Sequence, residues 1–329
     1  MMAVDMQDFA YRRQSNYSLE MTHMCTSLTI TDAATHLLLG RTMDFPTKTP
    51  WQLTYLPIDY HWQPITAPTE FTFQYAVLGG MRATHGHYLI GDGVNSAGLA
   101  VAELYFPVEA HYYDQPVSGK LNLSPQDFTS WLLSQNSSVA QIAQRLPEIA
   151  LIGVPWYDQE AIYPFHWLIA DATGTYIIEP TTHTLTITRN PTDVLTNTPS
   201  LAKQTANLNQ FLHMNPSDRR WLTTQLALQA YHGAVPNRTI PTDRFIKATL
   251  WRWRDSSDTL VTRSCLTKFL QTMTIPKQND HHDYTHYYGV LDIDAQAYRF
   301  KGIAHPTVTT AKLPELMRRS TSPIILAKE

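Results

Sequence analysis

The chain has 329 residues, of which 43% are hydrophobic and 16% are charged, and its formal net charge at pH 7 is -3. This length and balance predict a globular protein with one large hydrophobic core or two ordinary ones. The Lys and Arg residues form neither a basic stripe for nucleic acid nor a polybasic patch for a membrane, so a small molecule is the expected partner. No apolar run reaches the roughly 18 residues that a membrane helix needs, and residues 1–23 lack the apolar core of a signal peptide.

The two cysteines, Cys25 and Cys265, lie too far apart in the chain for a disulfide framework or a zinc cluster. Such sparse cysteine usage indicates a reducing compartment, and we expect a cytoplasmic protein. Residues 1–24 are polar and weakly patterned, and we expect them to be disordered, removed, or upstream of the true start. The remaining residues, 25–329, contain no linker rich in Gly, Pro or Ser and are predicted to form a single domain.

The N-terminal third of the chain alternates polar and apolar residues with the period of β-strands. A hairpin is predicted over residues 25–44, with a polar turn at Thr31–Thr35. Further strands are expected in residues 71–80 and 87–106, and the second of these segments folds back at Asn95–Gly98. This part of the chain is therefore predicted to be rich in antiparallel sheet.

The rest of the chain alternates blocks of strands and helices. Ser124, Pro125 and Asp127 together form a helix-start signature, which predicts helices over residues 124–147. The remaining pattern predicts, in chain order, strands over residues 165–190 with a turn at Ala172–Gly174, helices over residues 201–214 and 242–272, and a hairpin over residues 286–303. Strand blocks separated by helix pairs favour antiparallel sheets covered by helices, which is an α+β arrangement.

The first predicted hairpin brings a cysteine, an arginine and an aspartate together. If the chain turns at Ala33 and Ala34, Cys25 lies across from Arg41 and Asp44, where cross-strand neighbours are about 5 Å apart. Arg41 favours the thiolate, which is the nucleophilic form of cysteine. Asp44 opposes the thiolate unless it binds another cation, and the α-amino group of a chain beginning at Cys25 would serve as that cation and as a base near neutrality. Considered alone, Cys25 fits a buried strand cysteine better.

A wider pattern changes this balance. The segments MCTSLTI, GRTMDFP, YAVLGG, GDGVNSAGLAVAELYFP, FHWLIAD, DVLTNTP, ANLNQF and PTDRFIKA follow one another from Met24 to about Ile303. Their order and sequence resemble the choloylglycine hydrolase family, the bile salt hydrolases and penicillin V acylases, which are N-terminal nucleophile hydrolases. The resemblance implies a four-layer αββα sandwich, a homotetramer, and a small-molecule amide substrate.

The resemblance also implies roles for particular residues. Cys25 matches the family's nucleophile, and Arg41 and Asp44 of the GRTMD segment match the pair beside it. Asn197 of the LTNTP segment matches the amide donor of the oxyanion hole. Arg244 of the TDRF segment matches the arginine near the reacting centre.

Tyr105 occupies the position at which the family branches differ. Bile salt hydrolases generally carry Asn there in a GLNFP motif, whereas this chain reads ELYFP, which resembles the penicillin V acylase branch. The resemblance therefore implies a penicillin V acylase-like amidohydrolase. Hydrolysis of conjugated bile salts or of N-acyl homoserine lactones stays open, and so does an inactive homologue that binds ligands if residues 1–24 remain attached.

The mechanism that the resemblance implies uses the nucleophile and no cofactor or metal. The Cys25 thiol attacks the amide carbonyl and its α-amino group carries the proton to the departing amine, which leaves a thioester for water to hydrolyse. Asn197 and a donor at Tyr105, its backbone N–H, stabilise the oxyanion.

Three other motifs are better explained without chemistry. HHDYTH, residues 281–286, is predicted to be a solvated loop and not a metal site, because no supporting ligands occur elsewhere. GDGVNSAG, residues 91–98, lacks the Lys-Ser/Thr ending of a phosphate loop and is predicted to be a hairpin turn. WRWR, residues 251–254, lies in an amphipathic helical pattern, so its tryptophans are expected to pack and its arginines to face water.

Overall fold

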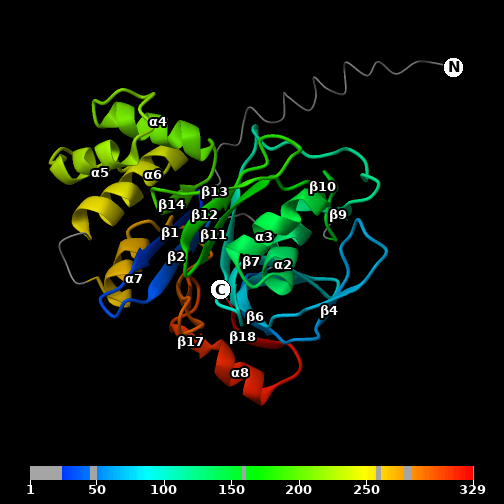
Figure 1. Cartoon of the computed structure of the whole chain (residues 1–329). Helices are drawn as coiled ribbons and strands as arrows, with labels where there is room; N and C mark the ends of the chain where they lie inside the picture. The colour runs from blue at the N-terminus through cyan, green and yellow to red at the C-terminus, as the bar shows by residue number, and fades with distance from the viewer. Residues whose placement is uncertain (1–23, 45–49, 158–160, 257–260, 278–283, 329) are drawn as a thin grey trace.

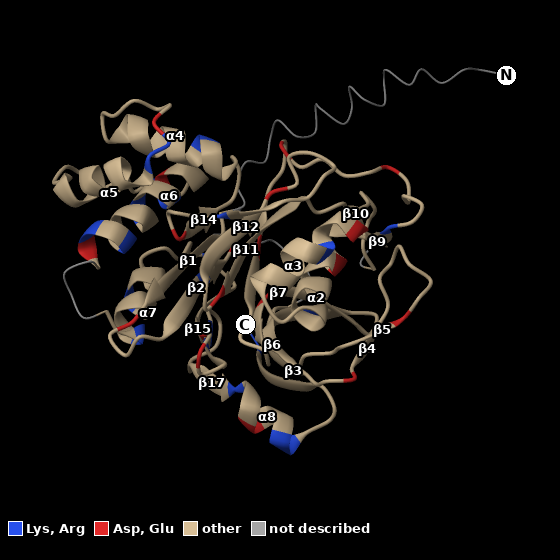
Figure 2. Cartoon of the chain, viewed as in Figure 1, with Lys and Arg blue, Asp and Glu red and all other residues tan. Residues whose placement is uncertain are grey.

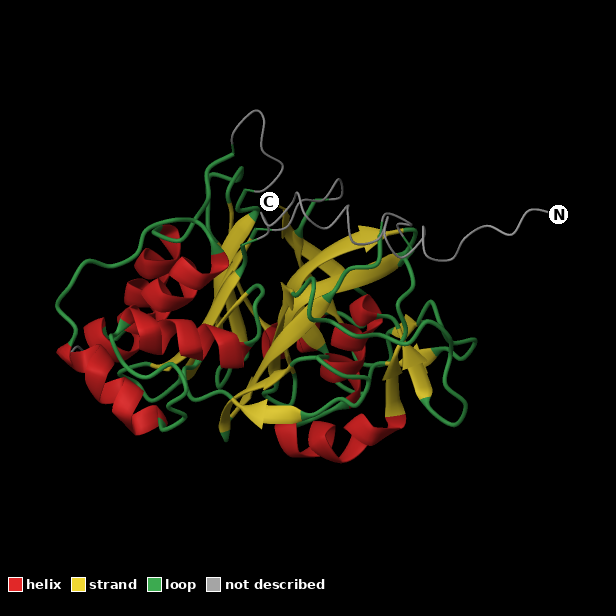
Figure 3. Cartoon of the chain, turned by 90° about the horizontal axis from the view of Figure 1, so that it is seen from above, coloured by secondary structure: helices red, strands yellow, loops and turns green. Residues whose placement is uncertain are grey.

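The computed structural model describes residues 24–44, 50–157, 161–256, 261–277 and 284–328. Two sheets pack face to face in the centre of these residues, and helices cover the outer face of each sheet (Figure 1). Seen from above, the order across the molecule is helix, sheet, sheet, helix (Figure 3). This is the four-layer αββα sandwich predicted from the sequence.

The first sheet has six antiparallel strands and contains the predicted hairpin at its centre. Its order is β14 (Val194–Thr196), β1 (Thr26–Thr31), β2 (Leu37–Met43), β15 (Tyr287–Asp292), β16 (Ala297–Gly302) and β17 (Thr309–Lys312). The turn between β1 and β2 follows from its sequence, because the Asp32 carboxylate accepts the backbone N–H groups of Ala34 and His36, each at 2.9 Å. The hairpin over residues 25–44 is confirmed.

The second sheet has eight antiparallel strands. Its order is β13 (Ile187–Arg189), β12 (Gly174–Ile178), β11 (Phe165–Asp171), β8 (Ala100–Tyr105), β7 (His87–Asn95), β6 (Val77–Thr84), β3 (Gln52–Leu56) and β18 (Ile324–Lys328). Two short pairs lie apart from it, β4 (His61–Trp62) with β5 (Phe71–Thr72) and β9 (Leu121–Leu123) with β10 (Ile149–Leu151). Of GDGVNSAG, residues 91–95 belong to β7 and only residues 96–98 lie in the predicted turn to β8, where the Asn95 side chain accepts the N–H groups of Ala97 and Leu99.

The helices divide between the two outer faces. On the eight-stranded sheet, α2 (Pro125–Gln135) packs on β7 and β8, and α3 (Val139–Arg145) packs on β11. On the six-stranded sheet, α6 (Pro241–Leu250) packs on β1 and β14, and α7 (Arg263–Gln271) packs on β2 and β15. A further helix, α4 (Leu201–Phe211), packs on α6. The remaining described helices are η2 (Leu146–Glu148), α5 (Trp221–Ala230), the π-helical turn η3 (Trp251–Asp255) and α8 (Leu313–Arg319).

The helix starts follow from the sequence where a capping side chain is present. The Ser124 hydroxyl accepts the backbone N–H of Asp127 at 3.1 Å, as the helix-start signature predicts. In η3, the predicted packing of WRWR is confirmed for the tryptophans. Trp251 stacks on Phe269, and Trp253 packs edge-to-face with Trp221. Arg252 differs from the prediction, because it bonds the carbonyl of Thr29 in β1 instead of facing water.

The alternation of side chains along β1 decides what faces the sheet interface. Thr26 contacts Arg244 of α6, on the helix side of the sheet. Thr29 reaches the opposite sheet, where its hydroxyl lies 2.5 Å from that of Thr175 in β12. Because successive strand residues point to opposite faces, Cys25 lies in the same row as Thr29, at the end of the layer between the sheets.

Several elements depart from the pattern read from the sequence. The predicted strand over residues 71–80 is interrupted between β5 and β6, because the N–H groups of Gln74 and Tyr75 bond the carbonyl of Ser134 at the end of α2. The helix that begins at Leu201 ends at Phe211. Nine of the described elements carry no prediction: β3, β4, β9, β10, β14, α5, β17, α8 and β18.

Residues 1–23 lie outside the described residues, and with them most of the segment predicted to be disordered or removed. None of the helices in the described parts of the chain combines the length and the apolar character that a membrane span requires.

The His36 ring links the start of β2 to the end of β15 and makes stability depend on pH. Its Nδ1 lies 2.9 Å from Asp292 Oδ2, and the hydrogen bond to Asp292 raises the pKa of His36. A pKa raised by folding means that the ion pair stabilises the protein below the unfolded-state pKa and is lost as pH rises through the folded-state value. The gain is small because His36 is 35% exposed.

We therefore expect His36→Gln to lower the thermal midpoint at pH 5.5, by on the order of 1–2 °C, and to change it less at pH 8.5. Thermal unfolding followed by circular dichroism at the two pH values measures this difference. An equal loss at both pH values would show that His36 contributes through packing alone.

Candidate active site

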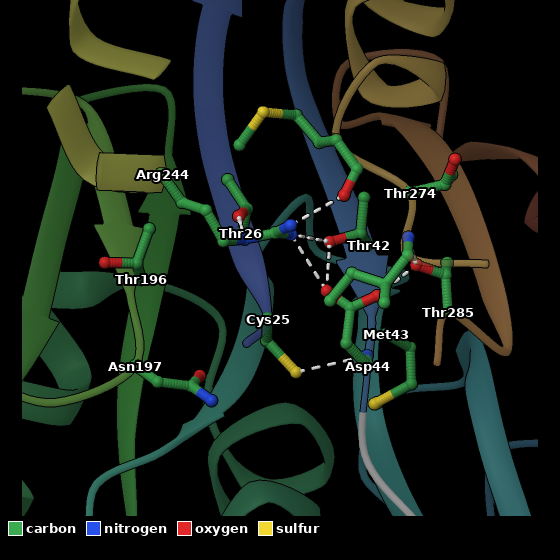
Figure 4. A network of polar contacts seen from close by, with 12 residues as sticks. Cys25, Thr26, Thr42, Met43, Asp44, Thr196, Asn197, Arg244, Thr274 and Thr285 are labelled. Atoms are coloured by element: carbon green, nitrogen blue, oxygen red, sulfur yellow. Dashed lines mark hydrogen bonds and ion pairs between the residues drawn. The ribbon is translucent and has the colours of Figure 1, made fainter. Parts of the chain in front are cut away.

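Cys25, Arg41 and Asp44 meet where β1 begins and β2 ends. The register of the hairpin sets Thr26 opposite Thr42, so Cys25 and Asp44 flank the last pair of the ladder. The backbone N–H of Asp44 donates to Cys25 Sγ at 3.4 Å (Figure 4). Arg41 Nη2 lies 3.8 Å from the same sulfur. The convergence predicted from the sequence is therefore present.

The guanidinium of Arg41 is held between the two sheets. Its Nη1 donates to the carbonyl of Gly91 in β7 and lies 3.5 Å from Asp92 Oδ2, while Nη2 donates to Met43 Sδ at 3.4 Å. Arg41 and Asp92 are both buried. The sheet opposite Cys25 therefore fixes where the positive charge stands.

Two opposing effects act on the Cys25 thiol. Burial raises the pKa of Cys25, because a thiolate loses its hydration between the sheets. Arg41 lowers the pKa of this thiol through its charge, and the backbone N–H of Asp44 lowers it through a hydrogen bond. Burial is the larger effect, so the pKa of the Cys25 thiol lies above its ordinary value, and a base beside the sulfur would favour its activation.

Asp44 binds a cation, and that cation is Arg244. Arg244 Nη2 donates to Asp44 Oδ2 and to Thr42 Oγ1, both at 2.9 Å, and Nε donates to Thr26 Oγ1 at 2.9 Å (Figure 4). Its Nη1 donates to the carbonyl of Met273 at 2.6 Å. The sequence analysis expected the α-amino group of a chain beginning at Cys25 to be the cation for Asp44, which stays a prediction. The structure shows a guanidinium from α6 bound to this carboxylate.

The remaining donors to Asp44 are threonine hydroxyls. Thr42 Oγ1 donates to Oδ2 at 2.9 Å, and Thr285 Oγ1 donates to Oδ1. Thr285 and His286 are both buried, so the prediction of a solvated loop is wrong for this part of HHDYTH, and residues 281–283 lie outside the described residues. Thr42 could have been found from its place two residues before Asp44 on one strand, but Thr285 carries no sequence signal.

Asn197 follows β14 and lies on the other side of Cys25 (Figure 4). The backbone N–H of Tyr105 donates to Asn197 Oδ1 at 3.1 Å. Because an N–H group can only donate, this contact fixes the amide orientation and leaves Nδ2 on the opposite side. Nδ2 is buried and has no hydrogen-bond partner among the described residues.

This geometry revises one predicted role. The family resemblance implied that the Tyr105 backbone N–H donates a hydrogen bond to the oxyanion. In the structure that N–H donates to Asn197 Oδ1 and so orients the amide. Among the described residues, Asn197 Nδ2 is a donor beside Cys25 that is left for a ligand. The six predicted site residues thus occupy one region, with Tyr105 acting on Asn197.

Within the described ranges, no group of three or more His, Cys, Asp or Glu side chains has an arrangement that could hold a metal ion. The arrangement offers a buried thiol, a positive charge beside it, and an amide donor facing it. These are the parts of a nucleophilic site for acyl transfer.

An αββα sandwich with a cysteine at the head of the first central strand defines an N-terminal nucleophile hydrolase fold. Residues 25–325 match the family described as linear amide C–N hydrolases, choloylglycine hydrolase family, and the match begins at Cys25. The chain belongs to this family and is a hydrolase of carbon–nitrogen bonds in linear amides.

Named relatives are consistent with this assignment. The bile salt hydrolase/transferase of Clostridium perfringens is 30% identical over 236 residues, covering 70% of this chain and 72% of the relative. The bile salt hydrolase/transferase of Lactiplantibacillus plantarum is 25% identical over 307 residues, covering 88% of this chain and 92% of the relative.

Solved structures show the same fold. A variant of conjugated bile acid hydrolase from Clostridium perfringens superposes with a TM-score of 0.79 at 22% identity, covering 93% of this chain and 97% of the other. Penicillin V acylase from Agrobacterium tumefaciens superposes with a TM-score of 0.70 at 18% identity, covering 91% and 90% of the two chains.

The position of Arg41 predicts its effect on thiol ionisation. Arg41→Met should raise the pH midpoint for alkylation of Cys25 by about 1 unit or more, because a positive charge near the sulfur is lost, and Arg41→Lys should raise it less. The measurement is the rate of iodoacetamide labelling against pH in a Cys265→Ser background, since Cys265 is exposed. A midpoint that is unchanged or lower in Arg41→Met would contradict this role.

Proposed function

We propose that Cys25 is the nucleophile of a linear amide hydrolase that works through a thioester. The observation that carries the proposal is the arrangement around the sulfur. Arg41 and the Asp44 N–H contact it, and Asn197, whose Nδ2 has no partner among the described residues, lies on the side of Cys25 away from Asp44 (Figure 4). The start of the family match at Cys25 supports the same assignment.

The base in this proposal is the α-amino group of Cys25, which exists only after residues 1–24 are removed. Its unperturbed pKa of about 7.7–8.0 suits proton transfer near neutrality. The raised pKa of the buried thiol supports the need for a base in the same residue. If the preceding residues remain, Cys25 has no free amine, and a ligand-binding role replaces catalysis.

The reaction then has two steps, formation of the thioester and its hydrolysis. The Cys25 sulfur bonds the amide carbonyl carbon, its proton passes to the α-amino group, and the tetrahedral oxyanion accepts a hydrogen bond from Asn197 Nδ2. The C–N bond breaks as the amine takes the proton, leaving a thioester, and water repeats the sequence to release the acid. One oxyanion donor of this kind contributes about 10²- to 10³-fold in rate.

Arg244 and Asp44 have a structural role in this mechanism. Together they hold the ends of β1 and β2, so that the Asp44 N–H points at the sulfur. Arg41 supplies the charge that favours the thiolate as the thiol loses its proton.

For the substrate, we propose an acyl group with an aryl substituent, as in penicillin V. The support is Tyr105, which matches the penicillin V acylase branch at the position where bile salt hydrolases carry Asn. Conjugated bile acids are the second candidate, and the similarity to bile salt hydrolases at 30% identity favours them.

The assignment of the nucleophile predicts the effect of two substitutions. Cys25→Ser should lower kcat by several orders of magnitude, because a serine hydroxyl is far less ionised than a thiol. Cys265→Ser, which changes the exposed cysteine, should leave kcat unchanged. Turnover of penicillin V and of glycine- and taurine-conjugated bile acids measures both, and a Cys25→Ser variant with normal turnover would exclude this nucleophile.

Intact mass of the active protein tests the proposed N-terminus independently. We expect a chain that begins at Cys25 and no activity from chains that retain residues 1–24. Full activity from an unprocessed chain would overturn the proposed base while leaving the nucleophile to be judged by Cys25→Ser.

Tyr105→Asn tests the acyl preference. An aromatic contact contributes about 0.5–1.5 kcal/mol beyond area burial, which corresponds to roughly a 2- to 12-fold change in the ratio of specificity constants. We expect kcat/KM for penicillin V relative to conjugated bile acids to fall by such a factor, with the N-terminus confirmed for both proteins. A wild type that prefers bile acids, or a ratio that does not move toward them, would defeat this preference.

A further inference from the structure

The chemistry proposed above requires the Asn197 amide to be held in one place. An oxyanion donor acts at about 2.7–3.1 Å, so small displacements of the donor weaken it. The side chain is held at its oxygen by the backbone N–H of Tyr105. The backbone of Asn197 therefore needs its own anchor, because a side chain can be no better placed than the main chain that carries it.

One such anchor comes from α4. Gln204 is fully buried, and its Nε2 donates to the carbonyl of Asn197 at 3.3 Å and to Thr196 Oγ1 at 3.2 Å. The Thr196 hydroxyl in turn donates to the carbonyl of Pro241, the first residue of α6, at 3.1 Å. One side-chain amide thus ties Asn197 to the helix that carries Arg244.

The position of α4 itself does not depend on this amide. Near the start of the helix, the backbone N–H of Ser200 donates to Glu109 Oε1 at 3.0 Å, and that of Leu201 donates to Glu179 Oε1 at 2.8 Å. The preceding Thr198 N–H donates to the carbonyl of Tyr105 at 3.1 Å. The Thr198 N–H and the Asn197 carbonyl belong to one peptide group, so Gln204 supplies one of two hydrogen bonds that hold it. Loss of the Gln204 donor should therefore loosen this peptide group without releasing the helix.

We propose that Gln204 is a positioning residue for the oxyanion donor: it fixes the backbone of Asn197 so that Nδ2 faces the carbonyl oxygen of the substrate as charge develops on it. The proposal rests on the proposed function, in which Asn197 supplies that donor. Its effect is confined to the transition state, so it lowers kcat and kcat/KM together and leaves KM unchanged.

The test is a double-mutant cycle between Gln204→Met and Asn197→Ala, with penicillin V as the substrate. Methionine keeps the length and volume of the side chain but removes the donor. Each rate is divided by the concentration of Cys25 that iodoacetamide labels in a Cys265→Ser background, so that inactive protein does not count. Alkylation itself needs no oxyanion donor and should proceed at the same rate in all variants.

We expect Gln204→Met to lower kcat per labelled thiol by about 10-fold, within the range that small misplacements produce. Asn197→Ala should lower it by about 10²- to 10³-fold. Once the Asn197 side chain is gone, Gln204→Met should cost nothing further, so the double variant should match Asn197→Ala. A purely structural Gln204 would give additive losses instead.

A matched control lies on the same helix. Asn209 is also a fully buried amide of α4, but it bonds Thr224 and the carbonyl of Asp218, away from the site. Asn209→Leu should lower the thermal midpoint without changing kcat per labelled thiol.

The outcomes distinguish failure of the positioning role of Gln204 from failure of the proposed function. Normal kcat in Gln204→Met beside an impaired Asn197→Ala overturns the positioning role and leaves the proposed function standing. Additive losses, or an Asn209→Leu variant as impaired as Gln204→Met, also overturn the positioning role. Normal kcat in Asn197→Ala removes the oxyanion donor from the proposed function, and the positioning role with it.

Discussion

The buried pair between Arg244 and Asp44 is the interaction on which the site depends. Both side chains are almost completely excluded from solvent. The guanidinium donates hydrogen bonds to residues at the ends of β1 and β2 and to the chain after α7. Such a pair adds little net stability compared with apolar packing, but removing one partner leaves a buried charge and costs about 3–5 kcal/mol. The pair therefore constrains the geometry, because the ends of β1 and β2 cannot separate without breaking its hydrogen bonds.

A second buried pair works from the other side of the same hairpin. Arg41 points from β2 toward the eight-stranded sheet, where Asp92 and the carbonyl of Gly91 receive it. Asp92 also accepts the hydroxyl of Tyr287, which comes from β15. A helix outside the six-stranded sheet and a strand of the opposite sheet therefore both contribute to the placement of one sulfur atom, α6 through Arg244 and β7 through Arg41. Because the two arginines are held by different elements, changes in one can be studied while the other stays in place.

The sequence predicts local features of this arrangement well. The hairpin over residues 25–44 follows from its period and from the turn chemistry around Asp32, and with it comes the meeting of Cys25, Arg41 and Asp44. The family resemblance adds Asn197 and Arg244 to the set. The sequence could not tell that Arg244 is the cation of Asp44, because the two lie 200 residues apart and no periodic pattern links a helix to a strand at that distance.

The same limit explains the elements that were missed. Thr285 reaches Asp44 from a segment of irregular backbone, whose side chains no period orders. In α5, Leu222 and Leu226 are exposed, so its apolar residues do not mark a face turned to the core. The edge strand β18 is placed by its pairing with β3, a contact between the two ends of the chain. Features set by contacts across the fold need the fold itself.

The amide of Asn197 has a thermodynamic consequence. Its Nδ2 is a buried donor without a partner among the described residues, and a buried donor costs about 1–3 kcal/mol of folding free energy wherever it stays unpaired. Any ligand that places an oxygen acceptor beside it recovers this energy on binding, and the folded chain gains stability in proportion to how well that acceptor fits. Heat resistance in the presence of small acids and amides is therefore a direct measure of how the site ranks its ligands.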